Sequence, residues 1–382
     1  MDSRLAIGVT HDSRWREVRA ALVRVHGIGL ECRVESVASV AASCAVPFPP
    51  DVARPMHEMI EAIRAVAARA EVSLDEVLVL GVHADTDDDA AENAAWVSAR
   101  LAELTGTTTV AGLSARDRAS GGCGRPTGTV CDWIAANDAR RSRFVLHLDD
   151  SSSLSHIPAR CGPAAVRSME TGPGIELLDS LAAALTQGRQ PGDPRGMLAV
   201  QGRQIKPLIR RWATHPFLQQ DSSRRLHPDD FSDAFVRETL EMTVERGWSV
   251  FDVLCTATHF VAACPADAVR QHLAKDCPAD DVVLVGRGTQ NGFLLRLVEE
   301  QFSGLGISTA PLPTIAPDAY GAVAAAVLAC LTLDGVPANL PAITGAAGPR
   351  LLGHLTPGTS RNWHACVEWM HRTVRPAVLR VA

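Results

Sequence analysis

Two stretches of this chain repeat one local pattern, in which an apolar strand is followed by a polar turn and a return strand. The first has expected strands at 4–10 and 20–27, and the second covers 143–157. Helical and strand-like runs alternate after each of them. This alternation predicts an α/β fold in which helices cover mixed sheets. The repetition itself predicts two similar halves, with a break near 140–146.

Hydrophobic spacing predicts the other elements. Buried strands are expected at 76–83 and 107–113, and another within 280–291 runs into a glycine-bearing turn. The run 320–333 is too short and too rich in alanine to span a membrane, so we expect a buried helix there. Further helices are expected at 49–72, 88–106, 174–187, 196–213, 230–246 and 250–274.

Composition narrows the class of protein. A chain of 382 residues favours two domains, and a net charge of −6 gives no reason to expect nucleic acid or an acidic membrane as a partner. The ten cysteines include no C-x-x-C pair, which predicts reduced, mostly buried thiols. The sequence begins without the pattern of a signal peptide. We therefore expect a cytoplasmic protein that acts on a small molecule.

Five motifs, taken in order, resemble one enzyme family. The segment "GVPANLPAITGAAGPRLLGHLTPG" carries the most specific match, because its NLPxxTGA core lies near the C-terminus as it does in that family. The chain is similar in these segments to the anhydro-N-acetylmuramic acid kinases. The motifs are "RDRASGGCGRPTGTVCD" (116–132), "ETGPGIELLDS" (170–180), "HPFL" (215–218), "GRGTQN" (286–291) and the segment quoted above (335–358).

The resemblance implies an architecture. Members of this family have two RNase H-like domains of the actin, Hsp70 and sugar kinase type around an interdomain cleft. On that basis the first domain is expected at 1–145 and the second at 146–359. Residues 360–382 are expected to form a C-terminal helix that packs back on the first domain. Family precedent also implies a homodimer.

The resemblance also implies an activity. The family opens the 1,6-anhydro ring of a cell-wall sugar with water and phosphorylates the freed hydroxyl group with Mg-ATP. The family's aspartate that activates the water corresponds to Glu170, which keeps the carboxylate but is one methylene longer. Without that role, Glu170 would be a surface carboxylate at a helix N-terminus. Substrate binding is implied for Arg116, Asp117, Gly122, Gly124, Thr171 and Gly172.

The expected phosphate loops depart from the family pattern. The first, M-S-G-T-S-L-D-G in the family, is replaced here over 9–16, so that both glycines are lost. The second, N-I-G-G-I-A-N-I-T, is replaced over 147–155, which puts two carboxylates where glycine N–H groups would face phosphate. Unit like charges 4 Å apart repel by about 4 kcal/mol at an effective dielectric constant of 20. The degenerate nucleotide site comprises Thr10, His11, Asp12, Ser13, Asp150, Gly286, Gly288 and Asn291.

Histidines and carboxylates recur where strands end. The family's H-G-Q-T corresponds to 83–86, so that His83 and Asp85 resemble the pair His147 and Asp149. One interpretation is a rebuilt site for acid–base chemistry or for a divalent metal ion. The other is a set of ordinary turn residues, since Asp and Ser favour turns. The sequence does not identify a metal.

Three functional hypotheses follow. The first is an enzyme that has lost efficient phosphoryl transfer and uses Glu170 as a base for hydration, elimination or ring opening of a small hydroxylated substrate. The second is a working, divergent ATP-dependent anhydro-amino-sugar kinase, in which arginines such as Arg14, Arg16 or Arg287 replace the lost N–H donors. Mg-ATP is a cofactor only under this second hypothesis. The third is a non-catalytic binding protein with the same fold.

Overall fold

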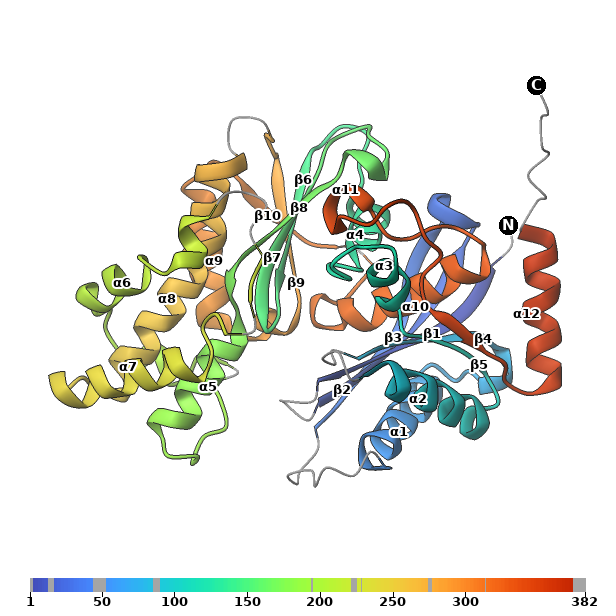
Figure 1. Ribbon diagram of the computed structural model, residues 1–382, viewed down its shortest axis with the longest axis horizontal. Coiled ribbons are helices and arrows are strands. Elements are labelled where there is room, and N and C mark those ends of the chain that lie inside the picture. Colours follow the sequence, from blue (N-terminus) through green and yellow to red (C-terminus); the bar gives the residue numbers. More distant parts are fainter. Residues whose placement is uncertain are drawn as a thin grey trace. The chain divides into compact units, whose positions relative to one another are not determined.

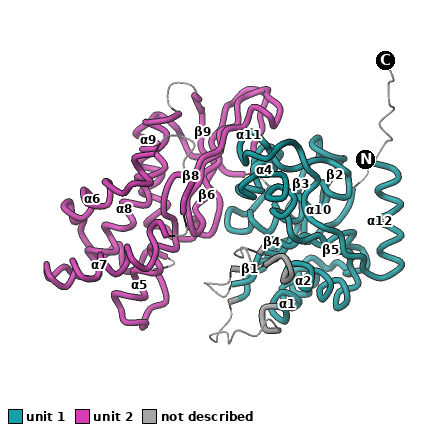
Figure 2. The backbone as a smooth tube through the Cα atoms, viewed as in Figure 1, with its two compact units in different colours: residues 1–135, 313–382 teal, residues 136–312 magenta. Residues whose placement is uncertain are grey.

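The computed structural model describes residues 3–12, 17–43, 53–84, 90–193, 195–220, 225–227, 229–273, 277–312 and 314–373 (Figure 1). The chain divides into two compact units (Figure 2). The first unit comprises 1–135 together with 313–382, and the second comprises 136–312. No helix in the described ranges is both long enough and apolar enough to cross a bilayer.

The described part of the first unit contains a six-stranded mixed sheet in the order β11-β5-β4-β1-β2-β3. β1, β2 and β3 are antiparallel neighbours, whereas β4 runs parallel to β1 and β5 runs parallel to β4. The expected first hairpin is therefore present. The strands are β1 (Ser3–Asp12), β2 (Glu17–His26), β3 (Arg33–Ser43), β4 (Val77–Ala84), β5 (Thr108–Ala111) and β11 (His354–Thr356).

Helix α10 (Tyr320–Leu333) packs against the middle of this sheet. Gly8 of β1 and Gly81 of β4 are directly paired, and both face the helix. A Cβ atom at Gly8 would lie 1.8 Å from the carbonyl oxygen of Ala322, and one at Gly81 would lie 2.0 Å from that of Ala325. The two glycines therefore permit the alanine-rich helix to approach the sheet backbone.

Alternate residues of the same strands face a second apolar layer. Ile7, Val9 and Leu80 are fully buried and share a core with Met59 and Ile63 of helix α1 (Ala53–Arg69). The spacing of apolar residues along α1 puts them on one face, as a helix that covers a sheet requires. Other helices of this unit are α2 (Ala90–Thr105), α3 (Ala115–Ala119), α4 (Thr129–Ala136) and α11 (Pro341–Thr344).

The C-terminal helix α12 (Ser360–Thr373) is held by a buried polar cluster. The guanidinium of Arg4 lies 2.6 Å from Oδ2 of Asp334 and stacks over the Trp369 ring, 4.5 Å from its centroid. The Trp369 indole N–H donates to Oδ1 of the same carboxylate at 2.8 Å. The start of β1, the end of α10 and α12 are thus connected through one carboxylate.

The second unit repeats the strand order of the first. Its described sheet runs β10-β9-β6-β7-β8, in which β6, β7 and β8 are antiparallel neighbours and β9 runs parallel to β6. In both units the first strand of the unit lies between its second and fourth strands. Two RNase H-like sheets of the same topology therefore occur in one chain. The strands are β6 (Arg143–Leu148), β7 (Ser151–Ile157), β8 (Arg167–Pro173), β9 (Asp281–Val285) and β10 (Ser308–Ala310).

Helices of the second unit pack on one face of this sheet. Fully buried Phe144, Leu146 and Leu154 share a core with helix residues such as Val261 and Val298. The buried members of this core all lie between Phe144 and Ile307, that is, within the unit. The helices are α5 (Ile175–Leu185), α6 (Lys206–Trp212), α7 (Asp233–Arg246), α8 (Val250–Ala268) and α9 (Gly292–Ser303).

Strands β3 and β8 were not predicted, and two of the stated expectations are wrong. The expected second domain at 146–359 is divided, because 313–359 groups with 1–135: α10 packs on β1 and β4, and β11 pairs with β5. The single helix expected over 196–213 is also wrong. A Cβ atom at Gly202 would lie 2.0 Å from the carbonyl oxygen of Phe251, so the chain passes closely there, and α6 begins only at Lys206, before Pro207. Proline suits the first turn of a helix because it lacks an N–H group.

Candidate active site

The carboxyl ends of the parallel strands β1 and β4 bring predicted residues together in the first unit. Thr10 is paired with His83, and His11 with Ala84. The side chains of Thr10, His11 and His83 are all partly exposed. Ligands of α/β proteins commonly bind at such strand ends. The predicted residues Ser13 and Asp85 lie outside the described residues, as does the side chain of Asp12.

In the second unit, the corresponding strand ends are those of β6 and β9. His147 is paired with Val285 there. Its Nδ1 atom lies 4.0 Å from Oδ2 of Asp149, and the Asp149 side chain is half exposed. The structure thus places the His147 ring beside the Asp149 carboxylate. His83 belongs to the other unit. The described residues include no group of three or more His, Cys, Asp or Glu side chains able to hold a metal ion.

Glu170, the predicted base, lies on β8 beside a β-bulge. Ser153 and Ser152 of β7 pair with Glu170 and Gly172, respectively, so that Thr171 is the extra residue. Bulges of this kind reorient side chains and are frequent beside active sites. Glu170 is only 8% exposed, and its Oε2 atom accepts a hydrogen bond from the backbone N–H of Leu226. The structure therefore makes Glu170 a buried, held carboxylate and not a surface residue.

The two residues that follow Glu170 have structural contacts. Thr171 is fully buried, and its hydroxyl lies 2.7 Å from the Ser152 hydroxyl. At Gly172, a Cβ atom would lie 3.0 Å from Cβ of Cys264, on α8. Both residues therefore stabilise the bulge and its packing on the core, and neither presents a side chain suited to binding substrate.

The turn after β9 packs on the turn between β6 and β7. Gly286 has φ +98°, and Gly288 would place a Cβ atom 2.8 Å from Cβ of Leu148. Asn291 is fully buried: its Oδ1 accepts the backbone N–H of Leu294 at 3.0 Å and so caps α9. These three residues of the predicted nucleotide site thus have well-defined structural roles within this unit.

Arg287, which replaces a glycine of the family pattern, is the centre of an ion-pair network. Its Nη2 atom lies 2.9 Å from Oδ1 of Asp150, and its Nη1 atom lies 3.0 Å from Oδ2 of Asp179. The backbone N–H of Arg287 donates to Oδ1 of Asp149 at 2.9 Å. Three carboxylates, those of Asp149, Asp150 and Asp179, therefore contact this one residue.

Asp179 is the buried member of that network. Its side chain is 1% exposed, and burial raises its pKa to about 6, against the opposing effect of the Arg287 guanidinium. The backbone N–H of Asp193 donates to its other oxygen at 3.0 Å. Asp179 was not among the predicted site residues, although it is the last acidic residue of the quoted "ETGPGIELLDS" motif. Its partner in the network is 108 residues away along the chain.

In the first unit, Asp117 connects the motifs at 116–132 and 335–358. Its Oδ1 atom accepts hydrogen bonds from Nδ2 of Asn339 at 2.8 Å and from the Thr344 hydroxyl at 2.7 Å. Oδ2 accepts the backbone N–H of Gly124 at 2.8 Å. A Cβ atom at Gly122 would lie 2.2 Å from Oδ2, so glycine is required there. Asp117 therefore holds the glycine loop in shape, whereas the predicted substrate residue Arg116 is exposed.

A buried pair that the sequence analysis did not select lies near Thr10. The hydroxyl of Tyr320, the first residue of α10, donates to Oδ1 of Asp132 at 2.7 Å. Burial raises the pKa of Tyr320 well above its usual value, so its hydroxyl stays protonated. Asp132 is the last residue of the motif at 116–132, and this position is the sequence signal that could have identified it. The pair fixes the start of α10, where a Cβ atom at Gly321 would lie 3.5 Å from Cγ2 of Thr10.

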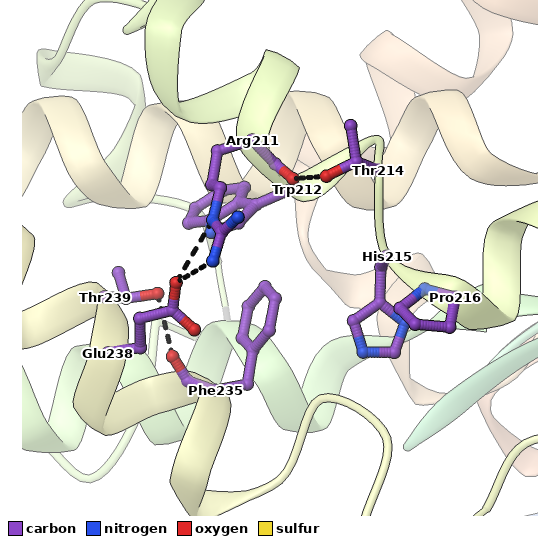
Figure 3. Close-up of a pocket in the computed structure, with 8 residues that line it drawn as sticks. All are labelled: Arg211, Trp212, Thr214, His215, Pro216, Phe235, Glu238 and Thr239. Carbon is purple, nitrogen blue, oxygen red and sulfur yellow. Dashed lines mark hydrogen bonds and ion pairs between the residues drawn. The ribbon is translucent and has the colours of Figure 1, made fainter.

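A hollow of about 190 Å³ lies beside α6 and α7 (Figure 3). Arg211 and Glu238 form an exposed ion pair at its edge, with Nη2 and Oε1 2.8 Å apart. His215 stacks on Phe231 with ring centroids 4.2 Å apart, and burial lowers its pKa. No predicted catalytic or binding residue lines this hollow. Its lining is Arg211, Trp212, Thr214, His215, Pro216, Phe235, Glu238 and Thr239.

Comparison with solved structures finds component A of the Acidaminococcus fermentans (R)-2-hydroxyglutaryl-CoA dehydratase, with 13% sequence identity and a TM-score of 0.44. The match covers 86% of this chain and 98% of that one. A ROK hexokinase from Thermus thermophilus matches at 14% identity and a TM-score of 0.36, covering 87% and 99%.

Sequence relatives are closer. An anhydro-N-acetylmuramic acid kinase of Salinibacter ruber is 29% identical over 387 aligned positions, covering 92% of this chain and 96% of its own. The enzyme of the same name from Acaryochloris marina is 32% identical over 259 positions, covering 67% and 68%. The one from Synechococcus elongatus is 35% identical over 265 positions, with the same coverage. The profile of the family matches residues 55–358. The chain therefore belongs to the anhydro-N-acetylmuramic acid kinase family.

Proposed function

We propose that this chain is a divergent ATP-dependent kinase of an anhydro-amino-sugar, with Glu170 as its general base. The observation that carries the proposal is the buried carboxylate of Glu170 beside the β8 bulge, held by the backbone N–H of Leu226. A general base needs a fixed position relative to the proton that it accepts. The names of the relatives supply the substrate class.

The chemistry assigned to Glu170 is the activation of water. One carboxylate oxygen is held by Leu226, which fixes the orientation of the group. The carboxylate accepts a proton from water as the water oxygen bonds to the anhydro carbon and the bond from that carbon to the bridging oxygen breaks. The released bridging oxygen then takes the γ-phosphoryl group of ATP, and ADP is the leaving group.

Magnesium accompanies ATP in this proposal. It commonly takes one or two protein carboxylates together with phosphate oxygens. The Asp150 carboxylate fits that chemistry, because it lies at the β6–β7 turn and its side chain is one-third exposed. When bound, the ion would supply charge neutralisation for the phosphate oxygens.

The test uses 1,6-anhydro-N-acetylmuramic acid, Mg²⁺ and γ-labelled ATP. We expect transfer of label to the sugar by the unaltered protein and a loss of at least about a hundredfold in kcat for Glu170→Gln. Glu170→Asp, which introduces the family's residue, should retain transfer. Glu299→Gln, an exposed glutamate on α9, is the matched control. Absence of transfer by the unaltered protein contradicts the proposal, and full activity of Glu170→Gln removes the assigned role.

A second candidate function is favoured by one observation. The Asp149 carboxylate already accepts a hydrogen bond from the backbone N–H of Arg287, and a phosphate group would otherwise use that donor. A chain in which that contact persists would open or hydrate the sugar without phosphoryl transfer. The same assay separates the two candidates, because consumption of the anhydro-sugar without formation of ADP supports only the second.

A further inference from the structure

The turn that follows β9 has the backbone form of an anion site. Gly286 adopts φ +98°, and the next peptide N–H, that of Arg287, points to the adjacent turn between β6 and β7. N–H groups exposed by glycine-bearing turns form concave sites for anions. The location also suits a ligand, because β6 and β9 are parallel and both end here.

A carboxylate of the chain itself occupies this position. Oδ1 of Asp149 accepts the Arg287 N–H at 2.9 Å. A Cβ atom at Gly286 would lie 2.6 to 2.8 Å from Oδ1, Cγ and Oδ2 of Asp149, so the carboxylate lies directly against the turn. The Asp149 side chain is 53% exposed, and the carboxylate can therefore leave the turn without opening the core.

Neighbouring carboxylates add to the repulsion that Asp149 exerts on an approaching phosphate. The Arg287 guanidinium is shared between Asp150 and Asp179, with distances of 2.9 and 3.0 Å. One guanidinium therefore faces two carboxylates, and Asp149 adds a third beside it. A phosphate at the turn would face the exposed carboxylate of Asp149 and the partly exposed carboxylate of Asp150 as well as the N–H donor. Phosphate binding at this turn thus requires the exchange of one anion for another.

We propose that Asp149 is an internal competitor for the phosphate groups of the nucleotide, and that its departure from the Arg287 N–H sets the nucleotide affinity of this chain. This inference rests on the proposed function in that it takes a nucleoside triphosphate as the ligand. It makes Asp149 a specificity-determining residue: the carboxylate holds the turn closed to weakly bound anions, and a triphosphate displaces it.

Calorimetric titration with ATP, in EDTA and without sugar, tests the proposal directly. Asp149→Ala frees the Arg287 N–H and should bind ATP at least tenfold more tightly than the unaltered protein. Asp149→Asn removes the charge but keeps an oxygen that can accept the N–H, so its gain should be smaller than that of Asp149→Ala. Asp267→Asn, which removes an exposed carboxylate on α8, should bind as the unaltered protein does.

The outcomes separate this inference from the proposed function. Equal or weaker ATP binding by Asp149→Ala, or no binding by either form, overturns the inference, provided that the variant melts cooperatively. If Asp149→Ala does not fold, Asp149→Ser carries the same test. Tighter binding by the variant supports the inference even where the sugar assay detects no transfer. Sugar phosphorylation with an unchanged ATP affinity in Asp149→Ala leaves the function in place and overturns only the inference.

Discussion

At the scale of single residues, the unusual feature is a carboxylate buried next to a shared cation. The side chain of Asp179 is 1% exposed and bonded to Arg287, yet burial raises its pKa from 3.8 to about 6. Desolvation of the charged form thus outweighs the attraction of a guanidinium that Asp150 also engages. The burial of Asp179 therefore costs stability when its carboxylate is ionised, and Arg287 offsets only part of that cost.

This cost predicts a pH dependence of stability. Because the pKa of Asp179 is higher in the folded state than in the unfolded state, the folded state binds more protons between about pH 4 and pH 6. The contribution of Asp179 to the free energy of unfolding is therefore most favourable near pH 4 and falls as the pH rises to about 6. A shift of about two pKa units corresponds to about 3 kcal/mol. In urea denaturation, Asp179→Asn should lose this fall, whereas parallel pH profiles would contradict the assignment.

The residue types at the site were predictable, but their contacts were not. The sequence placed acidic side chains at 147–155 and an arginine within 286–291, each identified as a departure from the family pattern. It did not indicate that Arg287 pairs with Asp150, because the two are 137 residues apart. A substrate-binding role for Asp117 follows only from the resemblance of the segment 116–132 to the family motif. Its hydrogen bonds to Asn339 and Thr344 give it a structural role that only the fold reveals.

At the scale of elements, the contact between α10 and the first sheet depends on glycine. Gly8 and Gly81 lie side by side, and backbone oxygens of α10 occupy the space of their missing Cβ atoms. Gly8→Ala would place a carbon 1.8 Å from the Ala322 oxygen, so either the strand or the helix must move. We expect a loss of more than about 3 kcal/mol in the free energy of unfolding, at or beyond the usual upper range for overpacking.

The matched control lies in the same contact. At Gly321, in α10, an added Cβ atom would lie 3.5 Å from Cγ2 of Thr10, which is an ordinary van der Waals distance. Alanine also favours the helix over glycine by up to about 1 kcal/mol. Gly321→Ala should therefore leave the thermal midpoint unchanged or raise it. If Gly8→Ala melts like the unaltered protein, the close approach of α10 to β1 does not exist in solution.

Elements whose own pattern determines them were predicted well. The helix expected at 320–333 is observed at those residues, because its continuous apolar sequence requires burial on all sides. The expectation failed for 196–213, where helical spacing continues through Gly202. There the close passage of Phe251, a residue 49 positions later, prevents a continuous helix. Local spacing does not contain that information.

At the scale of the whole molecule, the second unit is an insertion within the first. Residues 136–312 form one compact unit, and the first unit takes both ends of the chain, 1–135 and 313–382. The sequence predicted two halves in succession because it repeats the hairpin once. The return of α10 and β11 to the first sheet is a long-range contact, and no composition change marks it.

This arrangement predicts which fragments fold alone. The buried core of the second unit lies entirely between Phe144 and Ile307, so a 136–312 fragment keeps its full set of core contacts. A 1–135 fragment would instead expose the face of β1 and β4 that α10 covers, including Gly8 and Gly81. It would also lose Asp334, the buried partner of Arg4.

We therefore expect cooperative denaturant unfolding for 136–312 and none for 1–135. Co-expression of 313–382 should restore a cooperative transition to 1–135, because that segment returns both α10 and Asp334, the partner of Arg4. A cooperative transition of 1–135 without that segment would show that the sheet does not need α10.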